Sequence, residues 1–408
     1  MNEMDYMYSG LIAVIDLESE EVEEVELEED FIREHLGGAS ANLALYEEYS
    51  EDNPIILGTG ILTGSLASGS SLGVMTAKSP LTGEIQHAPF VWFTGPELKF
   101  TGFDFVVIKG VAADPVYLWI HDEIVDINSA GDLWGMDTWG VVDHIRDEQG
   151  EERVQVLAIG AAGENKLPYA QVTNNYWVSG DFAGFGAIFG EKNLKAVAFR
   201  GMGEVDIADP EGFVEKAASL LDSAKADIDG RKGPEWIVEK AGYDINGIES
   251  FVHRYDACFN CPYPCQTFVK YNEDPKTMDR GVDEPGVLIT ELSGLSTISQ
   301  KLSMEESLRA IEKCARLGLN PAVAGALIDT LADLETIASS EAEIGGVAGG
   351  SFIPEIGTGG KVGLVLGICP VLMLLVPAID KASLVELVNL GCDWDLTVEE
   401  LDEVVDRL

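Results

Sequence analysis

Three cysteines in one short segment constrain this chain more than any other feature. Cys258, Cys261 and Cys265 lie in the segment Cys-Phe-Asn-Cys-Pro-Tyr-Pro-Cys, which is a CxxCxxxC pattern. The spacing brings three thiols within reach of one metal centre, and Pro262 and Pro264 prevent a continuous helix there. Thiolates donate strongly to iron, and a [4Fe–4S] cluster needs four ligands. The segment therefore predicts a loop that holds an iron–sulfur cluster together with a fourth, distant ligand.

The three remaining cysteines are candidates for that fourth ligand. Cys314 lies in a segment with helical periodicity, which is typical of a cysteine in a hydrophobic core. Cys392 is expected in a short loop and remains a candidate. Cys369 precedes Pro370 in a non-helical break within an apolar segment. The break suits a buried ligand, because an apolar environment limits the access of solvent to a cluster.

Two other interpretations of the cysteines stay open at this point. Zinc prefers four Cys or His ligands, commonly in paired CxxC motifs. The sequence has no second CxxC, and His253 is the one histidine near the segment. Cysteines can also pack in a core without binding anything. Disulfides are not expected, because the chain is predicted to be cytoplasmic and such proteins are kept reduced.

The charge of the chain excludes several classes of partner. The sequence has 26 Lys and Arg against 71 Asp and Glu, a formal net charge of −45. Such a surface repels nucleic acid and anionic membranes. It is typical of a halophile's cytoplasmic protein, in which salt screens the repulsion; an acidic docking face for a basic partner is the alternative. The apolar run 363–378 is too short for a membrane span and contains two prolines.

The pattern of apolar residues predicts an α+β protein with two parts. Short β-branched or aromatic runs between Gly, Asp and Pro predict strands at residues 11–17, 55–57, 73–76, 105–108, 116–120 and 154–159. Residues 1–205 are therefore expected to form a β-rich domain of layered sheets, and residues 206–408 a mostly helical region. Helical spacing is found at 30–36, 210–224, 304–317, 322–337, 382–390 and 397–408. Thr397 and Glu400 predict a capping box at the start of the last helix.

Several motifs together resemble the aldehyde ferredoxin oxidoreductase family. They are Leu-Gly-Gly at 36–38, GTGILTG at 58–64, AKSPLTG at 77–83, GPELKF at 95–100, GEKNLK at 190–195 and DWDLT at 393–397. The run 77–83 followed by 95–100 is highly specific for that family. The resemblance implies a two-layer β domain that cradles a bis-pterin tungsten cofactor (tungstopterin). It also implies oxidation of an aldehyde to a carboxylate, with electrons leaving through a [4Fe–4S] cluster to ferredoxin or another redox subunit.

The resemblance also assigns residues to the cofactors. Cys369 falls where the family places its distant fourth cluster ligand. The positions that correspond to the pterin site are Lys78, Gly95, Gly186, Gly318 and Gly367. The resemblance also allows a homodimer.

The chain departs from the family where the pterins should bind. Gly37-Gly38-Ala39-Ser40 replaces the usual Gly-Gly-Arg-Gly, and Leu72 stands where the family has an arginine. Trp92 and Phe182 also replace small or polar residues, and the three bulky side chains are expected to fill the pterin cavity. The segment that carries the family's catalytic histidine is missing, which indicates an internal deletion near residues 338–361. No catalytic residue can therefore be assigned.

Two classes of function follow from these departures. The first is a non-catalytic, cluster-bearing relative in which the tungstopterin site is eroded. The second is an active tungstopterin aldehyde oxidoreductase with an atypical site. A dinucleotide enzyme is a third interpretation, based on Gly58-x-Gly60 and Gly184-x-Gly186. Neither tract fits the GxGxxG fingerprint of that class.

Overall fold

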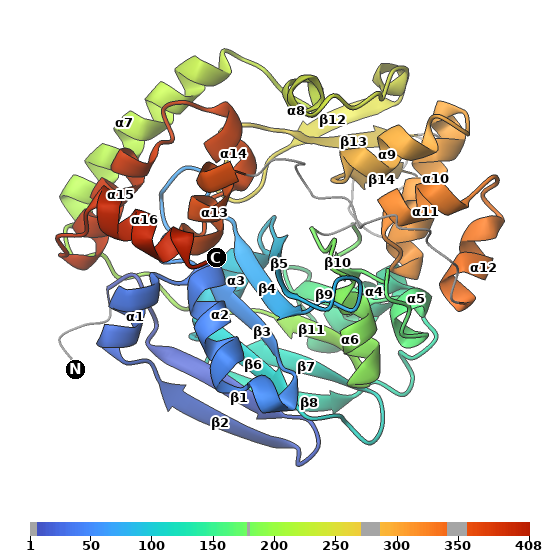
Figure 1. Ribbon diagram of the computed structural model, residues 1–408, viewed down its shortest axis with the longest axis horizontal. Helices are drawn as coiled ribbons and strands as arrows, with labels where there is room; N and C mark the ends of the chain where they lie inside the picture. Colours follow the sequence, from blue (N-terminus) through green and yellow to red (C-terminus); the bar gives the residue numbers. More distant parts are fainter. Residues whose placement is uncertain (1–5, 178–179, 271–285, 341–356) are drawn as a thin grey trace.

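The computed structural model describes residues 6–177, 180–270, 286–340 and 357–408 of the 408-residue chain. Figure 1 shows the two β-sheets of the first half beneath a layer formed mainly by the helices of the second half. The expected α+β fold is confirmed. The predicted deletion near 338–361 falls largely on residues outside the described part of the chain.

The first sheet has six strands in the order β2-β1-β6-β3-β4-β5. Strands β1 and β6 pair in parallel, and the other neighbours are antiparallel. The bounds are β1 (Leu11–Asp16), β2 (Glu21–Glu26), β3 (Ile55–Thr59), β4 (Gly73–Lys78), β5 (Ile85–Phe90) and β6 (Phe105–Lys109).

The second sheet has five strands in the order β10-β9-β11-β7-β8, with β11 and β7 parallel. The bounds are β7 (Val116–His121), β8 (Ile124–Ser129), β9 (Gln155–Ile159), β10 (Val172–Asn174) and β11 (Leu194–Phe199).

The two sheets pack face to face because their side chains alternate. Val106 of β6 and Leu157 of β9 lie in the core between the sheets. Their neighbours Val107 and Val156 lie in separate cores on the outer faces. This period of two is what a strand dictates. The layered domain expected from the sequence is therefore present.

Short helices cover the outer faces and the sheet ends. They are α1 (Glu29–His35), α2 (Gly38–Glu48), α3 (Thr94–Phe100), α4 (Thr138–Gln149), α5 (Ala161–Glu164) and α6 (Phe185–Glu191), with a 3₁₀ turn at Ser50–Asp52. Ala41 and Leu45 of α2 pack on the first sheet, and Val141 and Ile145 of α4 on the second.

The second half is mostly helical but also contains a three-stranded antiparallel sheet in the order β12-β13-β14. Its strands are β12 (Val252–Asp256), β13 (Gln266–Lys270) and β14 (Gly286–Ile289). The sequence analysis missed this sheet. The helices are α7 (Pro210–Ile228), α8 (Glu235–Ala241), α9 (Leu292–Ile298), α10 (Met304–Leu317), α11 (Pro321–Leu327), α12 (Asp333–Ser339), α13 (Gly357–Leu366), α14 (Pro370–Leu375), α15 (Lys381–Cys392) and α16 (Val398–Asp406), with a 3₁₀ turn at Ile248–Ser250.

Three expectations need correction. The single helix expected at 322–337 is two helices, α11 and α12, because the chain is extended at Ile328 after the end of α11. The acidic segment after β1, for which no strand was expected, forms strand β2 and pairs with β1. Cys392 is the last residue of helix α15 and not part of a loop.

The apolar run 363–378 is divided between α13 and α14. Among the residues that the structure describes, no helix is both long enough and apolar enough to span a membrane.

Candidate metal centre

The three clustered cysteines lie on the connection between strands β12 and β13. The backbone turns tightly there: the Cys261 N–H donates to the Cys258 carbonyl at 3.1 Å, and the Cys265 N–H donates to the Tyr263 carbonyl at 2.8 Å. Asn260 has a positive φ of 46° within this turn, a conformation that asparagine tolerates better than most residues. The expected loop is therefore formed by a short, internally bonded turn.

Tyr263 fixes the far side of this loop. Its ring is buried, and its hydroxyl donates to the Gly233 carbonyl at 2.6 Å. The Gly233 N–H donates in turn to the Pro264 carbonyl at 2.8 Å. These two bonds fasten the loop to the turn between α7 and α8, so the positions of the cysteines do not depend on the loop alone.

The loop between β3 and β4, residues 60–72, joins the cysteine loop to Cys369. Figure 1 shows this loop rising from the first sheet toward α13 and α14. The Gly69 carbonyl accepts from the Cys369 N–H at 3.0 Å, and the Gly69 N–H donates to the Asn260 carbonyl at 2.9 Å. The Asn260 side chain donates to the carbonyls of Leu66 and Ala67 at 2.6 and 2.9 Å. These hydrogen bonds hold the distant Cys369 beside the cysteine loop.

The thiols of Cys258, Cys261, Cys265 and Cys369 lie close enough for each charge to affect the pKa of another. Burial raises the pKa of Cys258 to about 12, and the nearby Cys369 thiol adds to the rise. The pKa values of Cys261 and Cys265 also lie well above the usual value, first because of burial and then because of the charges on the other cysteines. Such mutual effects require the sulfurs to be close together.

The environment of Cys369 also suits a thiolate held by a metal. Burial raises the pKa of this thiol, while the backbone N–H groups of Leu372 and Val371 oppose the rise by hydrogen bonding to the sulfur. Next to Gly69, the Ser68 hydroxyl is buried and has no hydrogen-bond partner in the described structure. A buried polar atom without a partner is costly, and a bound group is one common explanation. The donor set of four thiols fits an iron–sulfur cluster.

A single metal ion fits this arrangement less well. In the described part of the chain, no group of three or more His, Cys, Asp or Glu side chains is placed to hold one ion. Zinc would need its thiolates about 2.3 Å from one centre. The ring of His253, the histidine nearest the loop in sequence, packs against Phe268 at 6.2 Å.

The two other cysteines lie elsewhere. Cys314 is fully buried in α10, as expected of a core residue. Cys392, at the end of α15, directs its thiol toward the Tyr6 carbonyl at 3.8 Å.

The five positions that correspond to a pterin site form two separate groups and one isolated residue. Gly95 and Gly367 both border the 60–72 loop: a Cβ on Gly95 would lie 2.7 Å from the Leu72 carbonyl carbon, and one on Gly367 would lie 2.0 Å from the Thr63 hydroxyl. Gly186 and Gly318 both border Gln171, whose carbonyl would lie 2.6 and 3.2 Å from their added Cβ atoms. Lys78 is exposed at the end of β4. The glycines therefore face the chain's own backbone.

The bulky replacements are largely buried. Leu72 is fully buried in a small core with Ala39, Val74 and Leu364. Trp92 is buried, and its carbonyl accepts from the Phe259 N–H at 3.1 Å. Phe182 is partly buried.

Buried polar atoms without partners mark the second glycine group. Gln171 is fully buried, and neither its amide oxygen nor its amide nitrogen has a hydrogen-bond partner in the described structure. The amide nitrogen of Asn320 is in the same situation. The two residues lie on neighbouring segments, since Gln171 donates to the Gly318 carbonyl and Asn320 donates to the Tyr169 carbonyl through their backbones. No motif in the sequence pointed to this pair.

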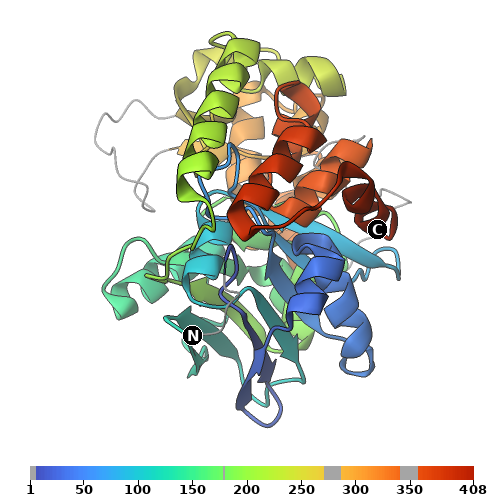
Figure 2. The ribbon, with the colours of Figure 1, turned by 90° about the vertical axis from the view of Figure 1, so that its left-hand side faces the viewer.

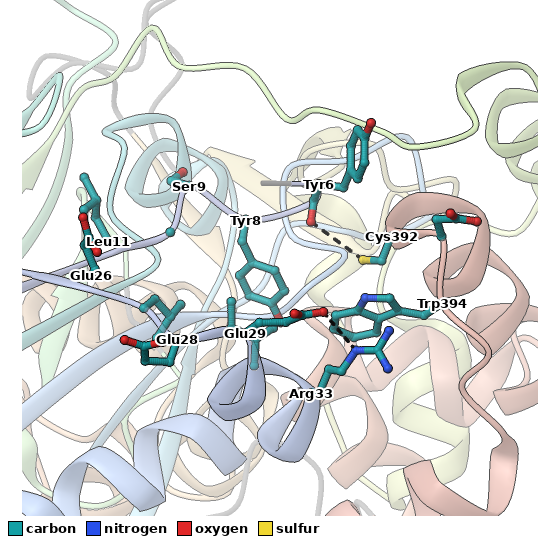
Figure 3. A pocket seen from close by; sticks show the side chains of 14 residues that line it. Tyr6, Tyr8, Ser9, Leu11, Glu26, Glu28, Glu29, Arg33, Cys392 and Trp394 are labelled. Carbon is teal, nitrogen blue, oxygen red and sulfur yellow. Dashed lines mark hydrogen bonds and ion pairs between the residues drawn. The ribbon is translucent and has the colours of Figure 1, made fainter. Parts of the chain in front are cut away.

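A cavity of about 460 Å³ lies between the N-terminal segment, α1 and the end of α15 (Figure 3). Arg33 is the cation of its lining, and its guanidinium lies 3.3 Å from the Glu29 carboxylate and 5.0 Å from the centre of the Trp394 ring. Glu26, Glu28 and Asp393 add negative charge to the walls. An anionic, phosphate-bearing cofactor is therefore disfavoured here.

Comparison with known proteins shows similarity to the family that the sequence motifs resemble. Residues 12–201 match the family model "Aldehyde ferredoxin oxidoreductase, N-terminal domain". The tungsten-containing aldehyde ferredoxin oxidoreductase of Pyrococcus abyssi is 37% identical over 292 residues, which cover 63% of this chain and 48% of the relative. The "Aliphatic sulfonate oxidoreductase, WOR-like subunit" of Pyrococcus furiosus is 32% identical over 239 residues, covering 53% and 37%. The chain thus spans about half the length of the curated relatives it matches.

The fold also has a counterpart among solved structures. The active site complex BamBC of benzoyl coenzyme A reductase, bound to 1,5 dienoyl-CoA, aligns with a TM-score of 0.68 and 22% identity. The alignment covers 98% of this chain and 65% of that chain, and it shows a shared fold. Taken together, the sequence motifs and the matched residues make residues 12–201 of this chain similar to the N-terminal domain of the aldehyde ferredoxin oxidoreductase family.

Proposed function

We propose that this chain is an iron–sulfur protein of the aldehyde ferredoxin oxidoreductase family, in which Cys258, Cys261, Cys265 and Cys369 hold one [4Fe–4S] cluster. The observation that carries the proposal is geometric: Gly69 accepts from the Cys369 N–H at 3.0 Å and donates to the Asn260 carbonyl at 2.9 Å, which holds Cys369 beside the loop of the other three cysteines. Such a cluster, when bound, supplies a site that takes up and releases single electrons. The chain's own part is to position the thiols and exclude water from them.

We further propose that the tungstopterin site is eroded, so that the chain carries electrons without oxidising an aldehyde itself. The burial of Leu72 among apolar side chains supports this, as does the close backbone packing at Gly95 and Gly367. A cofactor phosphate is commonly bound by arginine. Yet each arginine in the described structure already contacts a carboxylate or a carbonyl of the chain: Arg33, Arg146, Arg153, Arg200, Arg231, Arg254, Arg309, Arg316 and Arg407.

The partner in this account is ferredoxin or another redox subunit that exchanges electrons with the cluster. The family's aldehyde oxidation would then belong to relatives that keep the cofactor. The redox partner and the aldehyde oxidation are both inferred from the relatives' names and from the family resemblance. The homodimer is a further possibility that the resemblance allows.

One observation favours the alternative of an active tungstopterin enzyme. The amide of Gln171 and the amide nitrogen of Asn320 are buried without partners beside Gly186 and Gly318. A pterin has many hydrogen-bonding groups that could satisfy them. Metal analysis separates the two functions: iron without tungsten supports the cluster-bearing relative, and iron with stoichiometric tungsten and pterin supports the enzyme.

The cluster itself is tested by changing one ligand. Cys261→Ser should remove most of the iron and the brown colour from protein purified without oxygen, because one thiolate of the four is lost. Cys314→Ser is the matched control: this cysteine is buried in α10, so its loss should lower stability but leave the iron in place. If C261S keeps the iron and colour of the unchanged protein, the ligand assignment is wrong.

A further inference from the structure

Exposed apolar side chains gather around the cysteine loop. Leu66 is 52% exposed, Phe93 37% and Met202 79%. In Figure 2 the loop after β3, which carries Leu66, lies above α3, and the segment that joins β11 to α7 passes beside them. Together with the partly buried rings of Phe100 and Phe259, these three side chains are called the cysteine-loop patch below.

The members of the patch are linked by direct contacts. The Phe259 ring lies 6.2 Å from the Phe93 ring and 6.3 Å from the Phe100 ring, both edge to face. The Leu66 carbonyl accepts from the Asn260 side chain. The Phe100 carbonyl accepts from the backbone N–H of the residue after Met202, at 2.8 Å. The three aromatic rings therefore contact one another, and backbone hydrogen bonds hold the segments of Leu66 and Met202 against them.

The patch lies at the proposed metal centre. Phe259 is the residue directly after Cys258, and Asn260 precedes Cys261. The Phe259 ring therefore connects the cysteine loop to the rest of the patch. Contiguous apolar surface of this kind marks interaction sites, and aromatic residues are enriched at the centres of protein interfaces.

The rim of the patch is acidic. Asp122, Glu123 and Glu204 are exposed, and the Asp122 carboxylate accepts from the Met202 N–H at 3.0 Å. The neighbouring cation, Arg200, is already paired with Glu97 at 3.3 Å. With a net charge of −45 on the whole chain, the potential around the patch favours a basic partner.

A second copy of the chain does not suit this surface. A twofold contact through the patch would bring the same carboxylates together from both copies, and like charges across an interface are costly. A ferredoxin as acidic as this chain would meet the same repulsion. Among the redox partners that the family resemblance allows, the acidic rim therefore favours a basic protein over an acidic ferredoxin.

We propose that the cysteine-loop patch is the docking surface for a redox protein whose contact face has an apolar centre bordered by lysine and arginine. The reason for this contact, electron exchange between the partner and the metal centre, rests on the proposed function. The docking itself depends only on residues of the described surface.

The docking is tested with a basic c-type cytochrome as the probe, at an ionic strength of about 0.15 M, where weak distant attraction is screened. Amide hydrogen exchange is followed with and without the probe. Slower exchange confined to residues 64–70, 93–102 and 200–206 is the expected result. Protection elsewhere on the acidic surface, or no binding, overturns the proposal.

Two matched variants complete the test. Phe93→Ser should weaken cytochrome binding about tenfold, as expected for an aromatic residue at the centre of an interface. Val111→Ser removes an apolar side chain that is 50% exposed but lies outside the patch, and it should change binding by less than about twofold. Equal effects of the two variants contradict the proposal. Iron is measured on the same samples, so that protection without iron would refute the proposed cluster while leaving the docking surface intact.

Discussion

At the scale of single residues, the proposed cluster site depends on the protonation of its thiols. Burial raises the pKa of Cys258 to about 12, so a bare thiol there is protonated and unreactive at neutral pH. A coordinating metal removes that proton outright. Without metal, therefore, the chain offers neither a catalytic thiolate nor an easily oxidised one.

A histidine in the first sheet supplies a pH prediction. Burial lowers the pKa of His87 from 6.5 to about 4, with a smaller contribution from the Lys361 charge. As the pH falls, the unfolded chain takes up this proton before the folded chain does, so stability present above about pH 6.5 is lost between pH 6.5 and 4. The unchanged protein should lose about 2 kcal/mol more than His87→Gln over that interval, since the side chain is only partly buried.

Unfolding titrations at several pH values measure this difference. His144→Gln is the control, because His144 is exposed on α4 and its variant should keep the pH slope of the unchanged protein. Identical slopes for H87Q and the unchanged protein would contradict the assignment.

The sequence predicts part of the site at this scale. The spacing of Cys258, Cys261 and Cys265 was enough to identify three candidate ligands, and the family resemblance selected Cys369 as the fourth. The contacts that join them were not visible, because Asn260 and Gly69 act through backbone bonds between distant segments. Glycine-rich segments at 64–71 carry no signal for such a contact beyond turn formation.

At the scale of elements, the junction between the first sheet and α13 depends on Gly367. Its φ is +85°, and a Cβ would lie 2.0 Å from the Thr63 hydroxyl and 3.0 Å from the Thr63 N–H. Gly367→Ala should therefore cost about 3 kcal/mol or more, from backbone strain and a steric clash together. Gly83→Ala is the control, since Gly83 has a φ of +75° but nothing within 4 Å of an added Cβ.

The control should lose only the conformational part, about 1 kcal/mol. Thermal unfolding of the two variants under one buffer gives the comparison. Similar losses for both would show that the junction is loose and that α13 does not pack closely on the loop at Thr63.

The last helix, α16, begins with the capping box that was predicted from the sequence, and the structure confirms it. Thr397 caps the helix by accepting from the Glu400 N–H, and the Glu400 carboxylate accepts from the Thr397 N–H at 2.8 Å. Thr397→Ala should destabilise the helix by about 1 kcal/mol. Hydrogen exchange in residues 398–406 should quicken accordingly, whereas Thr397→Ser should leave it nearly unchanged. Faster exchange in both variants would argue against the capping role.

Strong local patterns predicted elements well, and long-range pairing explains the failures. Met304–Leu317 was predicted with the bounds that the structure shows, because its apolar stripe and its cap agree. Strand β2 was missed, since Glu21–Glu26 has four glutamates and only two valines and leaves little apolar surface. Strands β12 to β14 were missed because their pairing, and not their composition, makes them strands.

At the scale of the whole molecule, the charge of −45 dominates. Repulsion among so many carboxylates opposes the compact state, and salt reduces it by shortening the Debye length from about 10 Å at 0.1 M to about 3 Å at 1 M. The melting temperature should therefore rise steadily with KCl concentration over that range. Sucrose at equal osmolality is the control for solvent exclusion. A melting temperature that is flat or falls in KCl would contradict a salt-adapted surface.

The domain boundary near residue 205 and the assignment of ligands remain predictions at this scale. The β-rich part ends with β11 at Phe199, and α7 begins at Pro210. The family match covers residues 12–201. The cysteine loop, however, is held by contacts from both parts, through the 60–72 loop and the turn at Gly233. Binding a cluster should therefore stabilise the molecule as a whole and not one part alone.

Metal and pterin analysis of protein purified without oxygen tests the central claim most directly. The account predicts about four iron atoms per chain, with sulfide, and neither stoichiometric tungsten nor pterin after acid release. Protein that contains no iron would contradict the cluster. Iron accompanied by one tungsten and pterin per chain would contradict the eroded cofactor site and identify an active enzyme instead.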